Sequence, residues 1–172
     1  MKEIIKNNKS VLIVFIGILI LVVMGIILIV RNDNKTFDLA SVSSQFTGYY
    51  SDINLEELEK ENIDYYFSIP TSEIENALLL SNFNPNEYSV NDEEEITPCL
   101  LLLLSDLSKE ELNEYYDSLN AFIISYTNSD SQNKELVSLY KNAILRRGYN
   151  YIYLIMGENN KILESELMRL YK

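Results

Sequence analysis

The sequence contains no histidine and no tryptophan, and its single cysteine is Cys99. Without histidine the chain lacks the usual general base at neutral pH, the Ser–His and Cys–His nucleophile pairs, and most zinc sites. One cysteine excludes an intramolecular disulfide framework and a C-x-x-C redox pair. Because Cys99 opens an apolar run, its thiol is expected to behave as a small hydrophobic side chain. We therefore predict no catalytic residue, no cofactor and no metal site.

Glycine is also scarce, with five residues in the chain. Gly148 and Gly157 stand alone, so the sequence offers no glycine-rich phosphate loop. The segment from Ser131 to Lys134 fits the S-x-x-K pattern of penicillin-interacting enzymes, but the companion S-D-N and K-T-G motifs are missing. Carboxylate pairs about one helical turn apart, such as Glu110 with Glu114 and Glu57 with Glu61, fall on predicted solvent-exposed helix faces. Solvation explains these pairs better than acid–base catalysis.

Basic residues are few beyond the first 30 positions. The chain has 14 bases and 26 acids; setting aside Lys2, Lys6, Lys9 and Glu3 leaves 11 bases and 25 acids, a formal charge of −14 for residues 31–172. Phosphate backbones and anionic lipid headgroups repel such a surface. The composition argues against nucleic acid as a partner and against peripheral lipid binding.

The longest stretch without a charged or strongly polar side chain covers residues 11–30. As a helix it is about 30 Å long, which matches the hydrocarbon core of a bilayer. A cleaved secretory signal is disfavoured because its apolar core is shorter and ends at small residues. The sequence therefore predicts an uncleaved transmembrane helix at residues 11–30 that contacts the lipid bilayer in a single-pass protein of the cell membrane.

Lysines before this apolar stretch set the expected orientation. A short basic tail ahead of a first span usually stays in the cytoplasm. The sequence predicts a cytoplasmic basic tail at residues 1–10, a juxtamembrane linker at residues 31–36 and an extracytoplasmic domain at residues 37–172. In the opposite topology, which stays open, the domain faces the cytosol.

Five consecutive leucines follow Cys99. As a strand, residues 99–104 extend about 20 Å; as a helix they extend about 9 Å, far short of a second membrane span. Apolar side chains at every position indicate a strand that is covered on both faces. Ser108 and Glu111 then form a helix-capping pair, and an apolar stripe continues to Tyr126. We predict a central strand that leads into a long amphipathic helix.

The spacing of apolar residues predicts the remaining elements of the domain. Steps of three and four residues indicate helices, and short apolar runs between turn residues indicate strands. Helices are expected at residues 37–50, 53–67, 70–75, 134–141 and 159–172, a strand at residues 76–83 and an acidic loop at residues 84–98. The predicted fold is α+β, with the transmembrane helix followed by one small domain of about four strands packed against amphipathic helices, mainly on one face.

One cationic cluster lies in this acidic domain. Apolar runs on both sides of Gly148 predict a β-hairpin, in which this glycine is available for a positive φ. Arginines beside tyrosines suit a carboxylate or phosphate ligand, or an acidic partner. The candidate patch for a ligand or partner consists of Arg146, Arg147, Tyr149, Tyr151 and Tyr153. Plain strand residues that pair with the protein's own glutamates are the favoured interpretation, and the ligand or partner patch is the functional alternative.

Two segments carry a resemblance to known proteins: "LYKNA" at residues 139–143 and "GYNYIYLIMGENNKI" at residues 148–162. Over roughly residues 37–172 the chain resembles an uncharacterised domain-of-unknown-function family of small Firmicutes envelope proteins. The resemblance implies a lipoprotein or single-span protein with one extracytoplasmic domain, and it implies no activity. The acidic loop at residues 84–98 departs from the family pattern.

The resulting hypothesis is a membrane-anchored cell-envelope protein that is not an enzyme and that binds another envelope protein or a wall component. Two alternatives stay open. The first is a small extracytoplasmic hydrolase or transferase that uses carboxylates or the Ser131 and Lys134 pair. The second is a membrane regulator whose domain faces the cytosol.

Overall fold

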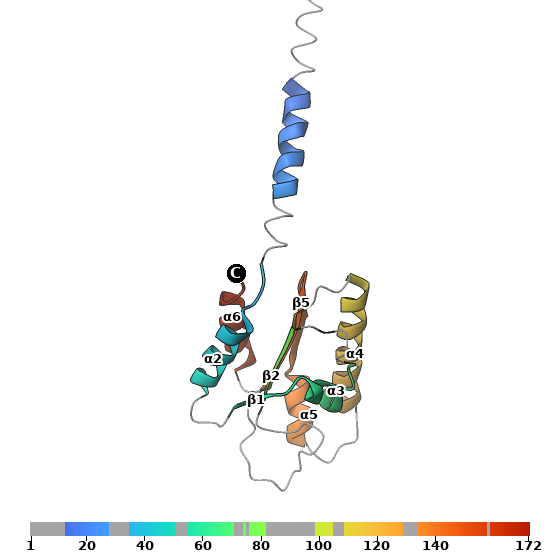
Figure 1. Cartoon of the computed structure of the whole chain (residues 1–172). Coiled ribbons are helices and arrows are strands. Elements are labelled where there is room, and N and C mark those ends of the chain that lie inside the picture. Colours follow the sequence, from blue (N-terminus) through green and yellow to red (C-terminus); the bar gives the residue numbers. More distant parts are fainter. Residues whose placement is uncertain are drawn as a thin grey trace, which may run out of the picture. The chain divides into compact units, whose positions relative to one another are not determined.

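The structure, a computed structural model, divides the chain into two compact units, Met1–Lys35 and Thr36–Lys172. The first unit contains one described helix, and the second contains the sheet and the remaining helices (Figure 1). The structure describes residues 13–27, 35–50, 55–70, 74, 76–81, 99–104, 109–128, 134–157 and 159–172.

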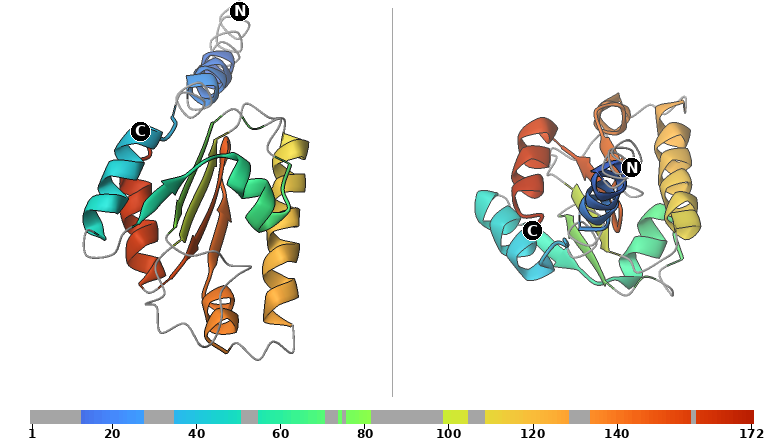
Figure 2. Two further views of the ribbon diagram at one scale, coloured as in Figure 1. Left: turned by 60° about the horizontal axis from the view of Figure 1, so that its bottom comes forward. Right: turned by 90° about the horizontal axis from the view of Figure 1, so that it is seen from above.

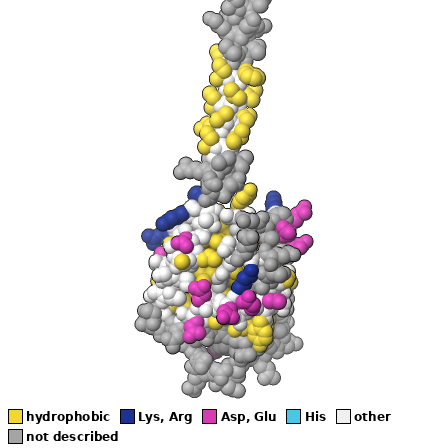
Figure 3. All heavy atoms as spheres, viewed as in Figure 1, with side chains coloured by type: hydrophobic (Ala, Val, Ile, Leu, Met, Phe, Trp, Pro, Cys, Tyr) yellow, Lys and Arg dark blue, Asp and Glu magenta, His cyan; other side chains and the backbone are white. Residues whose placement is uncertain are grey.

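The helix of residues 13–27 is the described part of the segment that the sequence predicts to cross a membrane. Its surface is largely hydrophobic, as Figure 3 shows. Within the described ranges, no helix has both the length and the apolar character needed to cross a membrane. On this finding the predicted transmembrane helix at residues 11–30 is wrong, and so is the predicted single-pass location with its cytoplasmic and extracytoplasmic sides.

The second unit is built on a five-stranded antiparallel sheet. This confirms the predicted α+β class; the described residues form five strands, and about four were expected. The strands, in their order across the sheet, are β1 (Glu56–Leu58), β2 (Asn76–Ser81), β3 (Cys99–Leu104), β5 (Tyr151–Met156) and β4 (Ile144–Arg147).

Helices cover both faces of this sheet (Figure 2). One face packs against α2 (Leu39–Tyr49) and α6 (Asn160–Arg169). The other packs against α3 (Glu61–Phe67), α4 (Lys109–Thr127) and α5 (Lys134–Lys141). The expectation that helices lie mainly on one face is therefore wrong. A continuous apolar strand needs cover on both sides, and the helices divide to supply it.

Strand β3 lies at the centre of the sheet, and all six of its side chains are buried. Leu101 and Leu103 belong to the core on the α4 face, while Leu100 and Leu102 belong to the core on the α2 and α6 face. This alternation follows from the two-residue repeat of a strand. The predicted central strand is confirmed, and so is the long helix that follows it, although Ser108 lies outside the described residues.

The predicted helix at residues 53–67 is only partly correct, because its first part contains a strand. Glu56, Glu57 and Leu58 form β1, and α3 starts at Glu61. Leu58 pairs with Leu79 of β2 and packs against the core on the α4 face. Glutamate and leucine favour helices in isolation, but here the pairing with a buried strand overrides that preference.

The two ends of the second unit are hydrogen-bonded to each other. The Thr36 N–H donates to the Lys172 carbonyl at 2.8 Å, and the Lys172 N–H donates to the Thr36 carbonyl at 3.1 Å. Beside them, Phe37 and Tyr171 form an isolated antiparallel bridge, and their rings lie 4.9 Å apart. The C-terminus thus lies beside the start of the domain (Figure 1).

Candidate functional site

The β4–β5 hairpin places the two arginines of the candidate patch on opposite faces of the sheet, because they are consecutive residues of one strand. Arg146 lies opposite Tyr153 in the strand register. Its Nε is 3.3 Å from Oε1 of Glu164 on α6, and the Tyr153 hydroxyl donates to the same oxygen at 2.7 Å. Glu164 therefore joins Arg146 and Tyr153 into one cluster.

Arg147 lies on the other face, toward α4. Its guanidinium carbon is 5.7 Å from the centroid of the Tyr116 ring, within range of a cation–π contact. The arginines therefore do not form a single cationic cluster. They are two separate charges on the two sides of one strand.

The three tyrosines of the patch differ in their surroundings. Tyr153 is 3% exposed, whereas Tyr149, in the turn, is 62% exposed. Tyr151 stacks on Tyr153 and makes an edge contact with Phe37, with ring centroids 5.9 Å and 5.1 Å apart respectively. Burial, helped by the hydrogen bond to Glu164, raises the pKa of Tyr153 well above its ordinary value. Tyr151 and Tyr153 thus mainly hold the hairpin together, and Tyr149 is the tyrosine that a partner can contact.

Gly148 does not have the positive φ that the hairpin was expected to use; Gly157 and two non-glycine residues do. A Cβ on Gly148 would instead overlap the ring of Tyr151. Glycine is needed at this position for close approach of the Tyr151 ring to the backbone, and not for a left-handed turn.

Strand β4 is an outer strand, and among the described strands it pairs with β5 alone. Bonded and non-bonded residue pairs alternate along an antiparallel ladder. The Gly148 N–H donates to the Tyr151 carbonyl at 2.9 Å, so Gly148 and Tyr151 are a hydrogen-bonded pair. The next hydrogen-bonded pair along the ladder is therefore Arg146 with Tyr153. The backbone N–H and C=O groups of Leu145 and Arg147 therefore point away from β5. They form an outward edge of backbone donors and acceptors.

The side chain of Arg146 folds back onto this edge. Its Nη1 donates to the Leu145 carbonyl at 3.3 Å, so the strand's own guanidinium occupies one of the outward acceptors. Arginine carries five N–H donors, and the contacts with Leu145 and Glu164 use only part of this capacity.

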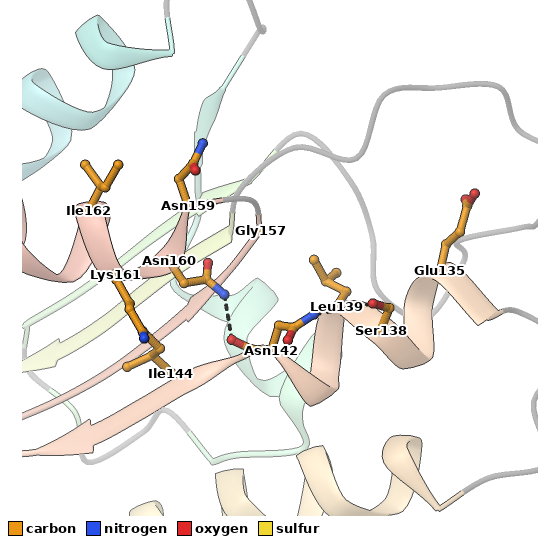
Figure 4. Close-up of a pocket in the computed structure, with 10 residues that line it drawn as sticks. All are labelled: Glu135, Ser138, Leu139, Asn142, Ile144, Gly157, Asn159, Asn160, Lys161 and Ile162. Atoms are coloured by element: carbon orange, nitrogen blue, oxygen red, sulfur yellow. Dashed lines mark hydrogen bonds between the residues drawn. The ribbon is translucent and has the colours of Figure 1, made fainter.

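A groove of about 820 Å³ opens at the start of β4, between α5 and the beginning of α6 (Figure 4). Leu139, Ile144 and Ile162 give it an apolar part. Its polar lining includes Glu135, Ser138, Asn142, Asn160 and Lys161. Ile144 belongs both to the groove and to β4, so the groove adjoins the start of that strand.

Asn160 fixes the geometry of the groove. Its Nδ2 donates to the Asn142 carbonyl at 2.7 Å, and this bond links the start of α6 to the end of α5 (Figure 4). Oδ1 of Asn160 is buried, and no donor among the described residues reaches it. The turn before α6 has left-handed backbone at Asn159, with φ 58°, and Gly157 has φ 154°. Asn160 is therefore a structural residue at the wall of the groove.

Three described residues that were considered for catalysis lie on different elements: Cys99 on β3, Lys134 on α5 and Glu57 on β1. Cys99 is 1% exposed, and burial raises the pKa of its thiol to about 12. Ser131 lies outside the described residues, and Lys134 begins α5. Glu57 accepts a hydrogen bond from the Ser43 hydroxyl at 2.7 Å. Among the residues that the structure describes, no cluster of three or more acidic, cysteine or histidine side chains is suited to hold a metal ion.

Sequence reasoning missed the side chains that complete the site: Glu164, Tyr116 and the groove residues. Glu164 follows Arg146 by a strand and a turn, and only the packing of α6 on the sheet brings them together. One local signal was present, because glycine and two asparagines stand between a strand and a helix at residues 157–160, where tight turns with left-handed backbone occur.

The fold and the site define a class of protein: an α+β domain whose antiparallel sheet lies between two layers of helices and ends in an outer strand flanked by arginines. No family model, no curated protein and no solved structure matches the chain. The resemblance to a family of envelope proteins stays a prediction.

Proposed function

We propose that the domain of residues 36–172 is a non-enzymatic binding module. It takes up a segment of another protein along the outer edge of β4 and into the adjoining groove. The observation that carries this proposal is the position of β4, an outer strand that begins in the groove and presents the backbone groups of Leu145 and Arg147 outward.

An outer strand is a ready template for another chain, since its free N–H and C=O groups can extend the sheet. The groove has the volume of known binding sites for small molecules and short peptide segments. Exposed Tyr149 lies just beyond the other end of β4 and adds an aromatic contact of the kind that interfaces favour.

A small hydrolase or transferase is the less favoured candidate. The buried Cys99 thiol is a poor nucleophile at neutral pH because its pKa is raised to about 12. Glu164, a carboxylate beside the candidate patch, is engaged with Arg146 and Tyr153.

Site-specific photo-crosslinking in the native cell tests the proposal. A benzophenone amino acid replaces Tyr149, and a matched control replaces Tyr65 on α3, because these side chains are 62% and 61% exposed. We expect a discrete crosslinked species of higher mass from position 149 and a much weaker one from position 65. Equal yields from both positions, or none from position 149, would count against a binding surface at the hairpin.

A further inference from the structure

We propose that the partner's segment is an acidic β-strand, with two consecutive acidic residues that lie beside Arg146 and Arg147. This inference rests on the proposed binding function and adds the chemistry and the sequence pattern of the partner. It is drawn from the outward backbone groups, the placement of the two arginines and the distribution of charge in the chain.

The backbone of β4 is prepared for an added strand. The outward groups of Leu145 and Arg147 have the spacing of a ladder, because they come from alternate residues. The guanidinium of Arg146 donates to the Leu145 carbonyl at 3.3 Å, the place where an added strand would put its own N–H. The arginine thus substitutes for the missing neighbour and is displaced when a strand arrives.

The side chains of β4 specify the order of residues in the added strand. Arg146 lies on the α6 face and Arg147 on the α4 face, with Glu164 and Tyr116 beside them respectively. Successive residues of an added strand also alternate between faces, so two adjacent acids place one carboxylate beside each arginine. Ile144 and Leu145 then face apolar residues. The pattern is acid–acid–apolar–apolar for an antiparallel strand and the reverse for a parallel one.

The charge distribution favours an acidic partner at this edge. Residues 36–133 contain 2 bases and 20 acids, a formal charge of −18, whereas residues 134–172 contain 7 bases and 4 acids, a formal charge of +3. The second stretch forms α5, β4, β5 and α6. The outer strand therefore belongs to the basic part of an acidic domain, together with α5, β5 and α6, while α4 on the Arg147 side is acidic. The basic part attracts acidic chains toward β4.

A second copy of the chain does not fit the same edge through β4. When two β4 strands pair antiparallel with Leu145 opposite Leu145, Arg146 and Arg147 lie opposite Ile144 and Ala143, so neither arginine meets a carboxylate across the ladder. Charged side chains on an outer strand also prevent unwanted pairing. The experiment therefore has to separate selective binding of acids from simple protection of the edge.

Fluorescence anisotropy with short labelled peptides makes this separation on the full chain. The probes are the fluorescein-labelled, end-capped hexapeptides TEEVVT and TVVEET, and the matched controls TKKVVT and TQQVVT. We expect one acidic probe to bind at least tenfold more tightly than both controls, with affinity that falls as salt rises. Binding that is equal for all four probes, or absent for the acidic ones, would overturn the acidic-strand proposal and leave β4 a protected edge.

Variants assign the binding to β4. Arg147→Glu should lower the affinity for the acidic probe at least tenfold and raise the affinity for TKKVVT. Arg169→Gln is the matched control, because Arg169 lies on α6 and pairs with Glu166; we expect no change beyond twofold. Because Arg147→Glu leaves the Arg146 and Glu164 pair in place, the fold should persist, and circular dichroism checks this.

A backbone readout completes the test. Amide resonances of Leu145 and Arg147 should shift on addition of the acidic probe and gain protection from solvent exchange, whereas those of Glu57 on the opposite outer strand should not. If the probes fail while crosslinks from position 149 persist, the binding function stands and its acidic specificity is lost. If both fail, both proposals fail.

Discussion

At the scale of single residues, Glu164 decides the character of the site. The carboxylate accepts the Tyr153 hydroxyl at 2.7 Å and lies 3.3 Å from Nε of Arg146. The interpretation favoured by the sequence, that the arginines pair with the protein's own glutamates, holds for Arg146. Arg147 instead lies over the Tyr116 ring. The two arginines have similar local sequence, and only strand alternation separates their environments.

Two tyrosine substitutions should have opposite effects on stability. The Tyr140 hydroxyl is buried without a hydrogen-bond partner among the described residues, so Tyr140→Phe should raise the free energy of unfolding by about 1 kcal/mol. Tyr153→Phe removes the hydrogen bond to Glu164 and should lower the free energy of unfolding by about 1 kcal/mol. Urea unfolding at pH 7 measures both. Equal changes of the same sign would contradict the assigned hydrogen bonding.

Cys99 should be inert in the folded protein. Burial raises its pKa from an ordinary 9.0 to about 12, despite the opposing hydrogen bond with Ser81, so at pH 8 the buried group is a thiol. We expect no reaction with a disulfide reagent until urea unfolds the chain. Rapid labelling of the native protein at pH 8 would show that β3 is accessible.

The same shift makes stability depend on pH. Because the folded pKa of Cys99 lies above the unfolded value, its contribution is fully present below pH 9.0 and is lost as pH rises toward about 12. The free energy of unfolding should therefore fall between pH 8 and pH 10, and it should fall less in Cys99→Ala. Identical slopes for the two proteins would contradict this assignment.

At the scale of the elements, the sequence predicts well where apolar spacing is strong. The local sequence pattern predicts three elements. The unbroken apolar run predicts central strand β3, the capping pair and apolar stripe predict helix α4, and the two apolar runs around a turn predict the β4–β5 hairpin. Strand β1 has no such pattern. Its glutamates look helical, and only its register with β2 determines its conformation. The division of the helices between the two faces of the sheet was not predictable for a similar reason. The face that each helix covers depends on contacts with strands that are distant in the sequence.

Two glycine substitutions test the tight part of the hairpin. Gly148→Ala pushes a methyl group into the Tyr151 ring and should lower the free energy of unfolding by about 1–3 kcal/mol. Gly48→Ala is the matched control in α2, where nothing lies within 4 Å of a Cβ, and it should raise stability by about 0.5–1 kcal/mol. Thermal unfolding compares the two. A neutral Gly148→Ala would mean that the Tyr151 ring can move aside without loss.

At the scale of the whole molecule, the apolar segment at residues 11–30 predicts a membrane crossing. Length and hydropathy together predict this crossing, but among the residues that the structure describes no helix is long and apolar enough to span a membrane.

The division at Thr36 predicts that residues 36–172 fold without the first unit. Removing Tyr171 and Lys172 from this fragment deletes both terminal hydrogen bonds and the contacts of the Tyr171 ring. This truncation should cost about 2 kcal/mol. Lys172→Ala keeps the backbone and should be neutral. Circular dichroism melting of the three fragments measures the differences, and equal stability of the truncated and complete fragments would contradict a structural role for the closure.

Because Thr36 and Lys172 are held together, the polypeptide enters and leaves this domain at nearly one point, about 5 Å apart across a strand pair. A protein with such adjoining ends can be carried in the surface loop of a host without stretching it. For the same reason a linker of a few residues could join the two ends and make the domain circular. A circular permutant with new ends in a solvent-facing turn would keep the order of the strands in the sheet.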